Sequence, residues 1–243
     1  MSRRFEELDW QPTEMGEISL RRRFQRTLQV DVYEVKLGEE FLMSSLFPVA
    51  EIELARLGLA ACAGAELDVV VGGLGLGYTA VTALEDPRVR SLVVVEALAP
   101  VLGWHRRHLL PDAGALTTDP RARLVQGDFF ALAGRDEGFE ARGPDRVHAV
   151  LLDIDHTPRH VLHPSHAAFY TPAGLHALHG HLHPEGAFAL WSDDPPDAEF
   201  LDLLGAEFAS ARAEVVTFAN PLTAGTSANT VYVAVRGGGD AGR

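Results

Sequence analysis

From Leu67 to Val235 the chain alternates between short β-rich apolar runs and longer stretches with the composition of helices. The β-rich runs cover residues 68–71, 92–95, 123–126, 147–152, 187–191, 214–218 and 230–235. Runs with few polar positions are typical of strands that helices cover on both faces, as in a parallel α/β sheet. Only a polar loop joins the last two runs, so we expect the final strand to run antiparallel. The pattern predicts a seven-stranded, mostly parallel sheet.

Residues 1–47 follow a different pattern, with strand-like segments and no helical stretch between them. Strand-like segments cover residues 17–24, 28–37 and 39–45, and Gly16 and Gly38 lie at natural turn positions beside them. Pro48 then begins a helical stretch over residues 49–61. We therefore expect a small antiparallel β-region at residues 1–47, a large α/β domain at 48–236 and a disordered tail at 237–243. Further helices are expected over residues 78–84, 101–110, 165–181 and 198–208.

The first strand of the large domain runs into a glycine-rich bend that opens a helix. Gly73, Gly75 and Gly77 form a GxGxG pattern directly after this strand. Glycines serve where a backbone must turn tightly or approach a ligand without a Cβ. Glu96 ends the next strand, 19 residues after Gly77, where an acid of a nucleotide-binding α/β fold accepts hydrogen bonds from ribose hydroxyls. These features predict a nucleoside site.

The third strand is followed by a second acid, Asp128. Its carboxylate can accept a hydrogen bond from an adenine amino group, while Phe129 or its neighbour packs on the ring. Dinucleotide sites usually have GxGxxG, whereas GxGxG with this later acid is typical of the class I methyltransferase-like fold. This Rossmann-like fold binds S-adenosylmethionine or its relatives. The candidate cofactor-binding residues are Gly73, Gly75, Gly77, Glu96, Ala97, Asp128, Phe129 and Asp153.

The charge of the chain narrows the function classes. With 21 Lys and Arg against 34 Asp and Glu, the formal net charge is −13, so we expect no nucleic-acid partner. The single cysteine, Cys62, excludes an internal disulfide and a multi-Cys metal site, and no metal is expected. The first residues lack the apolar core of a signal peptide, and the uncharged stretches 69–84 and 215–235 do not suit a bilayer. A cytoplasmic protein without membrane contact is expected.

Several segments resemble the spermidine synthases, which are polyamine aminopropyltransferases. The resemblance covers roughly residues 16–235 and rests on the motifs EEF at 39–41, GGLG at 72–75, VVE at 94–96, GD at 127–128, VLLDIDHTP at 150–158 and FY at 169–170. It implies transfer of an aminopropyl group from decarboxylated S-adenosylmethionine to a polyamine or related amine. It also implies that Asp153 is the catalytic aspartate and that two copies form a homodimer through the N-terminal region.

Three positions depart from the pattern of that family. The glycine motif (LGL at 74–76) lacks the acid with which the family helps to hold the aminopropyl amine. Asp153 and Asp155 are two residues apart rather than three, and MSS at 43–45 replaces the family's Tyr-His-Glu, so that the next acid is Glu51. Two alternatives therefore stay open. One is methyl transfer from S-adenosylmethionine to a small molecule, and the other is a non-catalytic nucleoside-binding homologue.

Acidic residues cluster after the fourth and fifth predicted strands of the large domain, at the edge where ligands bind in open parallel sheets. An acidic pocket favours an acceptor with ammonium groups, because paired charges lower the cost of burying them. Transfer would be an in-line displacement in which Asp153 orients the amine and accepts its proton. Eight of the 11 histidines lie between His156 and His183, and we expect all but His156 to be structural. The candidate substrate-binding residues are Glu51, Asp155, His156, Asp193 and Asp194.

Overall fold

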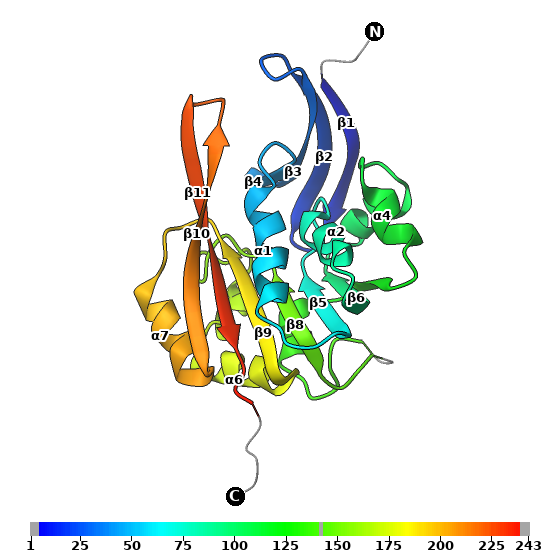
Figure 1. Ribbon diagram of the computed structural model, residues 1–243. Coiled ribbons are helices and arrows are strands. Elements are labelled where there is room, and N and C mark those ends of the chain that lie inside the picture. Colours follow the sequence, from blue (N-terminus) through cyan, green and yellow to red (C-terminus); the bar gives the residue numbers. More distant parts are fainter. Residues whose placement is uncertain (1–4, 141–142, 239–243) are drawn as a thin grey trace, which may run out of the picture.

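The computed structural model describes residues 5–140 and 143–238, which form two β-sheets and the helices that cover the larger one (Figure 1). The smaller sheet is antiparallel, in the order β1-β2-β3-β4. Its strands are β1 (Phe5–Thr13), β2 (Gly16–Gln25), β3 (Val30–Leu37) and β4 (Glu40–Ser44). The expected N-terminal β-region is confirmed, but sequence reasoning missed β1. No residue of β1 is fully buried, so its apolar alternation is weak.

The larger sheet has seven strands in the order β10-β11-β9-β8-β5-β6-β7. They are β5 (Leu67–Gly72), β6 (Val89–Glu96), β7 (Ala122–Gln126), β8 (Val147–Leu152), β9 (Leu182–Ser192), β10 (Ser210–Asn220) and β11 (Gly225–Val235). Strands β5 to β9 pair in parallel, whereas β11 runs antiparallel to both β9 and β10. The predicted mostly parallel sheet with an antiparallel final strand is confirmed.

Helices cover both faces of this sheet. One layer contains α1 (Val49–Ala60), α2 (Tyr78–Glu85), α3 (Ala99–Arg106) and α4 (Ala113–Thr118). The other contains α5 (Phe129–Ala133), the 3₁₀ turn η1 (Pro164–Ala168), α6 (Pro172–Gly180) and α7 (Ala198–Glu207). Val69 and Val71 of β5 pack into the first layer and Val70 packs into the second. Such strands are apolar at every position because both faces are buried.

Two helix boundaries differ from the prediction for local reasons. The helix expected over 165–181 is interrupted, because Thr171 caps α6 by accepting a hydrogen bond from the Gly174 N–H at 3.3 Å, and Pro172 stands in the first turn. The helix expected over 101–110 begins at Ala99 and ends at Arg106. Two residues beyond its end, His108 has a positive φ of 53°, which is incompatible with continuing the helix.

The final hairpin is longer than predicted. Strands β10 and β11 pair continuously from Ser210 with Val235 to Asn220 with Gly225, whereas the sequence indicated only 214–218 and 230–235. The extra pairs contain polar residues, which a search for apolar runs overlooks. Within the described residues no helix is long and apolar enough to cross a bilayer. The predicted tail at 237–243 falls largely on residues 239–243, which lie outside the described residues.

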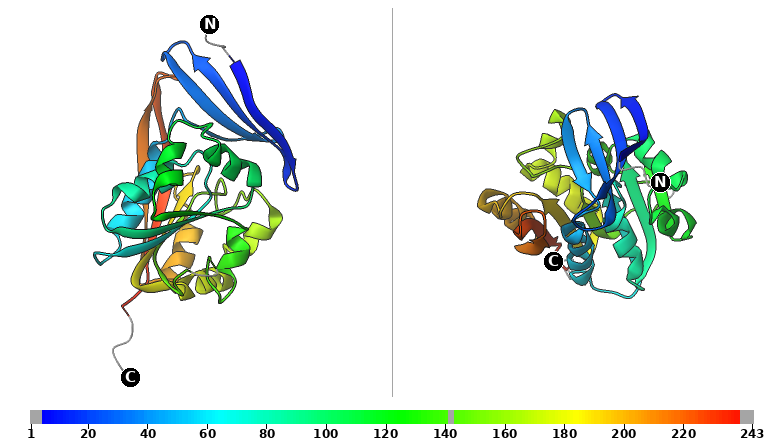
Figure 2. Two further views of the ribbon diagram at one scale, coloured as in Figure 1. Left: turned by 90° about the vertical axis from the view of Figure 1, so that its right-hand side faces the viewer. Right: turned by 90° about the horizontal axis from the view of Figure 1, so that it is seen from above.

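The N-terminal sheet lies over the end of the large sheet where the parallel strands terminate (Figures 1 and 2). It is attached on one side by Asp9 of β1, whose Oδ2 accepts hydrogen bonds from Trp104 Nε1 and Arg107, both at 2.7 Å. On the other side the ring of Phe47 lies 5.8 Å from that of Phe218 in β10. The N-terminal sheet and the β10–β11 hairpin therefore both reach the carboxyl ends of the strands.

Candidate active site at the ends of the parallel strands

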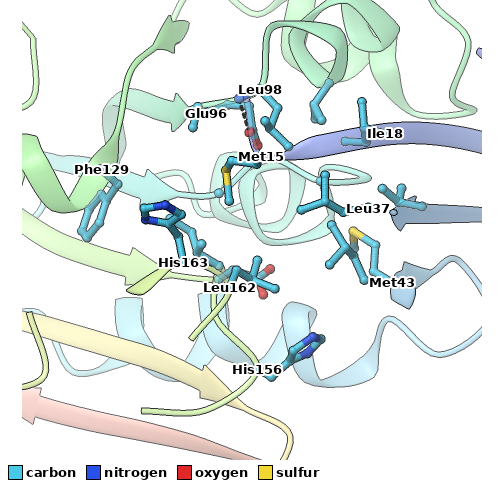
Figure 3. A pocket seen from close by; sticks show the side chains of 18 of the residues that line it. Met15, Ile18, Leu37, Met43, Glu96, Leu98, Phe129, His156, Leu162 and His163 are labelled. Carbon is cyan, nitrogen blue, oxygen red and sulfur yellow. Dashed lines mark hydrogen bonds between the residues drawn. The ribbon is translucent and has the colours of Figure 1, made fainter. Parts of the chain in front are cut away.

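A cavity of about 1300 Å³ lies between the N-terminal sheet and the carboxyl ends of β5 to β9 (Figure 3). Glu96 and Leu98 lie on one side of it, Leu37 and Met43 on another, and His156 lies at a distance from Glu96 (Figure 3). Ligands of open α/β sheets bind at this edge. The predicted residues that line the cavity are Glu51, Gly73, Gly75, Glu96, Ala97, Asp128, Phe129, Asp153, His156 and Asp193.

The glycine loop adopts backbone conformations that side chains rarely allow. Gly73, Gly75 and Gly77 all have positive φ, of 91°, 46° and 95°. An added Cβ on Gly73 would collide with the backbone oxygen of Asp153, and one on Gly75 would collide with the sulfur of Met43. The glycines therefore make room for neighbouring protein atoms as well as for the turn. Gly77 begins α2 and does not line the cavity.

The backbone N–H groups of this loop are occupied by protein acceptors. The Gly73 N–H donates to the Val95 carbonyl at 2.9 Å, and the Gly77 N–H donates to the Leu74 carbonyl at 2.8 Å. The Leu76 N–H donates to Met43 Sδ at 3.3 Å. A ligand carboxylate that bound to any of these three N–H groups would have to displace the protein acceptor.

Glu96 connects the glycine loop to the next strand. Its Oε2 accepts a hydrogen bond from the Leu74 N–H at 3.0 Å, and its Oε1 accepts one from the Leu98 N–H at 2.8 Å. Burial raises the pKa of Glu96, and these backbone N–H groups oppose the rise. Ala97 lies beside it on the cavity wall. The carboxylate is thus held in place at the cavity wall by two backbone donors.

Asp128 lies at the start of α5. Its Oδ1 caps the helix by accepting from the N–H groups of Phe130 and Ala131, at 2.9 and 3.2 Å. Phe129 is almost fully buried, and its ring stacks on Phe139 at 5.3 Å in the core. Phe130 is the more exposed aromatic residue at this end of the cavity, and its ring stacks on His166 at 4.0 Å.

Glu51 and Asp153 come from distant parts of the chain and line the cavity together. The Thr79 hydroxyl donates to Asp153 Oδ2 at 2.8 Å and lies 3.3 Å from the Glu51 backbone oxygen. Burial raises the pKa of Glu51 to about 8, and the charges of Asp153 and then Asp193 add to the rise. Burial also raises the pKa of Asp153 to about 6, against the effect of the Thr79 hydrogen bond.

The two acids after β9 differ in position. Asp193 lines the cavity, and its Oδ1 accepts a hydrogen bond from Asn229 at 2.8 Å. Asp194 is exposed and outside the cavity, and its backbone oxygen accepts from Thr230 at 2.7 Å. His156 does line the cavity, but its Nε2 lies 2.8 Å from Glu40 Oε1 on β4. His156 therefore joins the loop after β8 to the N-terminal sheet.

Asp155 does not line the cavity. Its carboxylate is almost inaccessible, and it accepts hydrogen bonds from the Leu162 N–H at 2.7 Å, His166 Nδ1 at 2.8 Å and the Tyr170 hydroxyl at 2.9 Å. Both of its oxygens thus have protein donors, and Asp155 supports the cavity wall from behind. His166, which lines the cavity, is thus positioned by an acid that the sequence placed among the substrate contacts.

Sequence reasoning missed several lining residues because they lie far from the motifs. Met15, Phe218 and Asn229 all line the cavity. Met15 lies near Leu98 in Figure 3, although 83 positions separate them in the chain. None of these residues belongs to a chemical pattern, and only the packing of the sheets brings them to the site. His163, which also lines the cavity, was expected to be structural.

The cavity wall is strongly acidic. No Lys or Arg lines it within residues 5–140 and 143–238. The same described part of the chain contains no cluster of His, Cys, Asp and Glu that could hold a metal ion. A site of this kind favours a cationic ligand over an anionic one. The carboxylates on the wall are Glu14, Glu51, Glu96, Asp128, Asp153 and Asp193.

Comparison with known proteins identifies the fold. No protein-family model and no curated protein sequence matches the chain. A crystal structure of spermidine synthase from Thermotoga maritima is similar with a TM-score of 0.71 and 14% identity, and the match covers 95% of this chain and 72% of that one. This chain has a spermidine synthase-like fold. A spermidine synthase in complex with the transition-state analogue AdoDATO is similar with a TM-score of 0.72 and 15% identity, over 95% of this chain and 74% of that one.

Proposed function

We propose that the protein transfers an aminopropyl group from decarboxylated S-adenosylmethionine to a small amine. One observation carries this proposal: a large cavity joins the Glu96 and Asp128 carboxylates to the acids Glu51, Asp153 and Asp193 without a lining Lys or Arg in the described residues. In the proposed complex, Glu96 accepts from the ribose hydroxyls and Asp128 from the adenine amino group. The other three acids face the cationic parts of the two substrates.

The charge of the wall supports the decarboxylated donor. S-adenosylmethionine carries a carboxylate, which needs a basic side chain or free N–H groups. The wall offers no Lys or Arg within the described residues, and the N–H groups of Gly73, Leu76 and Gly77 already have protein acceptors. The decarboxylated donor brings only a sulfonium and an ammonium, which suit an acidic wall. The similar spermidine synthase in complex with AdoDATO supports binding of such a ligand.

In the proposed reaction the amine nitrogen attacks the carbon beside the sulfonium, and the carbon–sulfur bond breaks with its electron pair going to sulfur. The amine must lose a proton before it attacks, and a carboxylate beside it can accept that proton. Asp153, held by Thr79 at 2.8 Å, orients the nitrogen. Alignment of nitrogen, carbon and sulfur supplies much of the acceleration.

Methyl transfer is the second candidate, and one observation favours it. The glycine loop contains no acid, and the thioether of Met43 occupies the space beside Gly75. A donor ammonium at that position would meet sulfur instead of a carboxylate. The amine acceptor, the cytoplasmic location and a homodimer through the N-terminal sheet stay predictions under either candidate.

The test is to incubate the purified chain with decarboxylated or unmodified S-adenosylmethionine and a panel of diamines and triamines, and to identify products by mass. We expect an aminopropyl adduct together with methylthioadenosine. A methylated product with S-adenosylhomocysteine would establish the second candidate. Binding of nucleosides without any product would mean that the chain is a non-catalytic homologue. Asp153→Asn, which keeps the shape of the side chain, should remove turnover if the chain is an enzyme.

A further inference from the structure

Two carboxyl groups of the cavity wall come from different elements, and no Lys or Arg of the described residues lines the cavity with them. Glu51 lies in the first turn of α1, and Asp153 directly follows β8. Thr79 of α2 links them, because its hydroxyl lies 2.8 Å from Asp153 Oδ2 and 3.3 Å from the Glu51 backbone oxygen. Glu51 is 8% exposed and Thr79 is 3% exposed. Glu51 is therefore nearly inaccessible, whereas Asp153 is half-buried, and both line the cavity.

The groups that face this pair from the surrounding elements are acidic or neutral. Helix α2 contributes Tyr78, whose hydroxyl has a pKa that burial raises. The end of β9 contributes Trp191 and Asp193, and the loop after β8 contributes His156, which is paired with Glu40. The β10–β11 hairpin contributes only uncharged residues, which are Phe218, Ser227, Ala228 and Asn229.

When two carboxyl groups line one cavity, burial and mutual repulsion oppose the second negative charge unless a cation binds near them. Burial first, and then the charges of Asp153 and Asp193, raise the pKa of Glu51 to about 8. The pKa of Asp153 is raised to about 6 by burial. Between these values the two groups titrate as a unit that holds one proton.

We propose that Glu51 and Asp153 between them hold one proton before substrate binds and release it to water when an ammonium group of the acceptor amine binds in this part of the cavity. The ammonium then supplies a positive charge, which no Lys or Arg of the described residues brings to the wall. This inference rests on the proposed function and deepens it, because it makes Glu51 a catalytic residue that the sequence placed only among the substrate contacts.

Release of this proton when the ammonium group binds also completes the proton balance of the proposed reaction. With both carboxylates ionised, Glu51 accepts the proton of the bound ammonium, and the freed nitrogen lone pair attacks the carbon beside the sulfonium. The carbon–sulfur bond breaks towards sulfur, and the product leaves as a secondary ammonium. The pair is then again singly protonated, as before binding. Each turnover releases one proton to water, namely the one displaced when the amine bound.

The inference can be tested by calorimetry without any turnover. Butane-1,4-diamine is titrated into the protein in the presence of saturating methylthioadenosine. The titration is repeated in buffers of different ionisation enthalpy. The dependence of the measured binding enthalpy on the ionisation enthalpy of the buffer gives the number of protons released per bound amine. The wild type should release about one more proton than Glu51→Gln at pH 7 and about a tenth of a proton more at pH 9. Subtracting the variant removes the contribution of the amine's own titration.

Glu53→Gln is the matched control. Glu53 lies on the same helix but outside the cavity, and it pairs with Arg56 at 3.0 Å. This variant should release as many protons as the wild type. Unchanged binding of methylthioadenosine by Glu51→Gln shows that the variant is folded.

Equal proton release by the wild type and Glu51→Gln at pH 7 would overturn the inference, and so would a wild type that does not bind the diamine. Failure of the proposed function looks different. In that case the diamine binds with the expected proton release, but no aminopropyl product forms when decarboxylated S-adenosylmethionine is added. Conversely, a chain that forms the product with equal proton release keeps the proposed function and loses this inference.

Discussion

The carboxylate of Asp155 holds the ring of His166, whose Nδ1 lies 2.8 Å from Asp155 Oδ1 with both side chains nearly inaccessible to water. The same carboxylate accepts hydrogen bonds from the Tyr170 hydroxyl and the Leu162 N–H. This contact joins the loop after β8 to η1 and to the residues before α6. Because these hydrogen bonds hold the Asp155 carboxylate behind the cavity wall, Asp155 stabilises the wall and does not line the cavity.

Replacement of Asp155 should therefore destabilise the fold. Asp155→Ala leaves three buried donors without their acceptor, and we expect the free energy of unfolding to fall by about 3 kcal/mol. Urea denaturation followed by circular dichroism measures this change. Asp194→Ala is the control, because Asp194 is exposed and its side chain is not used by Thr230, and its effect should stay within about 0.5 kcal/mol. Equal stability of the two variants would contradict the role of Asp155.

Glu96 should determine nucleoside affinity. Glu96→Gln removes the charge that, in the proposed complex, accepts from the ribose hydroxyls, and it replaces an acceptor of the Leu74 and Leu98 N–H groups with an amide. Losing hydrogen bonds to a charged group weakens binding by about 2 kcal/mol, which is a reduction in methylthioadenosine affinity of more than tenfold. Calorimetry measures the dissociation constant. Glu85→Gln, at the exposed end of α2, should bind like the wild type. Undiminished affinity of Glu96→Gln would place the ribose elsewhere.

Gly73 should not tolerate a side chain. Gly73→Ala combines a positive φ of 91° with a Cβ that collides with the Asp153 backbone oxygen, so we expect a loss of at least about 2 kcal/mol of stability. Thermal denaturation measures this loss. Gly114→Ala is the matched control, because a Cβ at this position in α4 meets nothing within 4 Å. It should be neutral or stabilising by up to about 1 kcal/mol. A fully stable Gly73→Ala variant would contradict the loop geometry.

The stability of the empty protein should fall as the pH rises from 5 to 8. The pKa of Glu51 is raised to about 8 in the folded chain, whereas an unfolded glutamate has a pKa of about 4.3. Between pH 4.3 and pH 8 the unfolded state has released the proton that the folded state keeps. The contribution of Glu51 to the free energy of unfolding, which is complete below about pH 4.3, is therefore progressively lost as the pH rises.

Glu51→Gln should abolish this part of the pH dependence. Relative to the wild type, the variant should gain on the order of 4 kcal/mol in free energy of unfolding between pH 5 and pH 8. Urea denaturation of both proteins at the two pH values gives the difference. A constant difference between wild type and variant would show that Glu51 ionises in the folded state as it does in water.

The alternation of apolar strands and helices predicted the architecture because its signal is local. A strand buried on both faces, such as β5, must be apolar at each position, and this requirement is visible in the sequence. By contrast, β1 and the outer parts of β10 and β11 consist of half-exposed residues. Their pairing depends on neighbouring strands, so a search for apolar runs cannot find them.

The sequence alone determined the parallel sheet, the glycine bend and the acids Glu96, Asp128 and Asp153, because tight turns and strand ends carry local chemical signatures. Only the tertiary structure decided that Glu51 and Asp153 line one cavity and that Asp155 is turned towards His166. The physical reason is that the charge state and contacts of a carboxyl group depend on its burial and its neighbours. Those neighbours come from α1, η1 and the N-terminal sheet, which are far apart in the chain and adjacent only after folding.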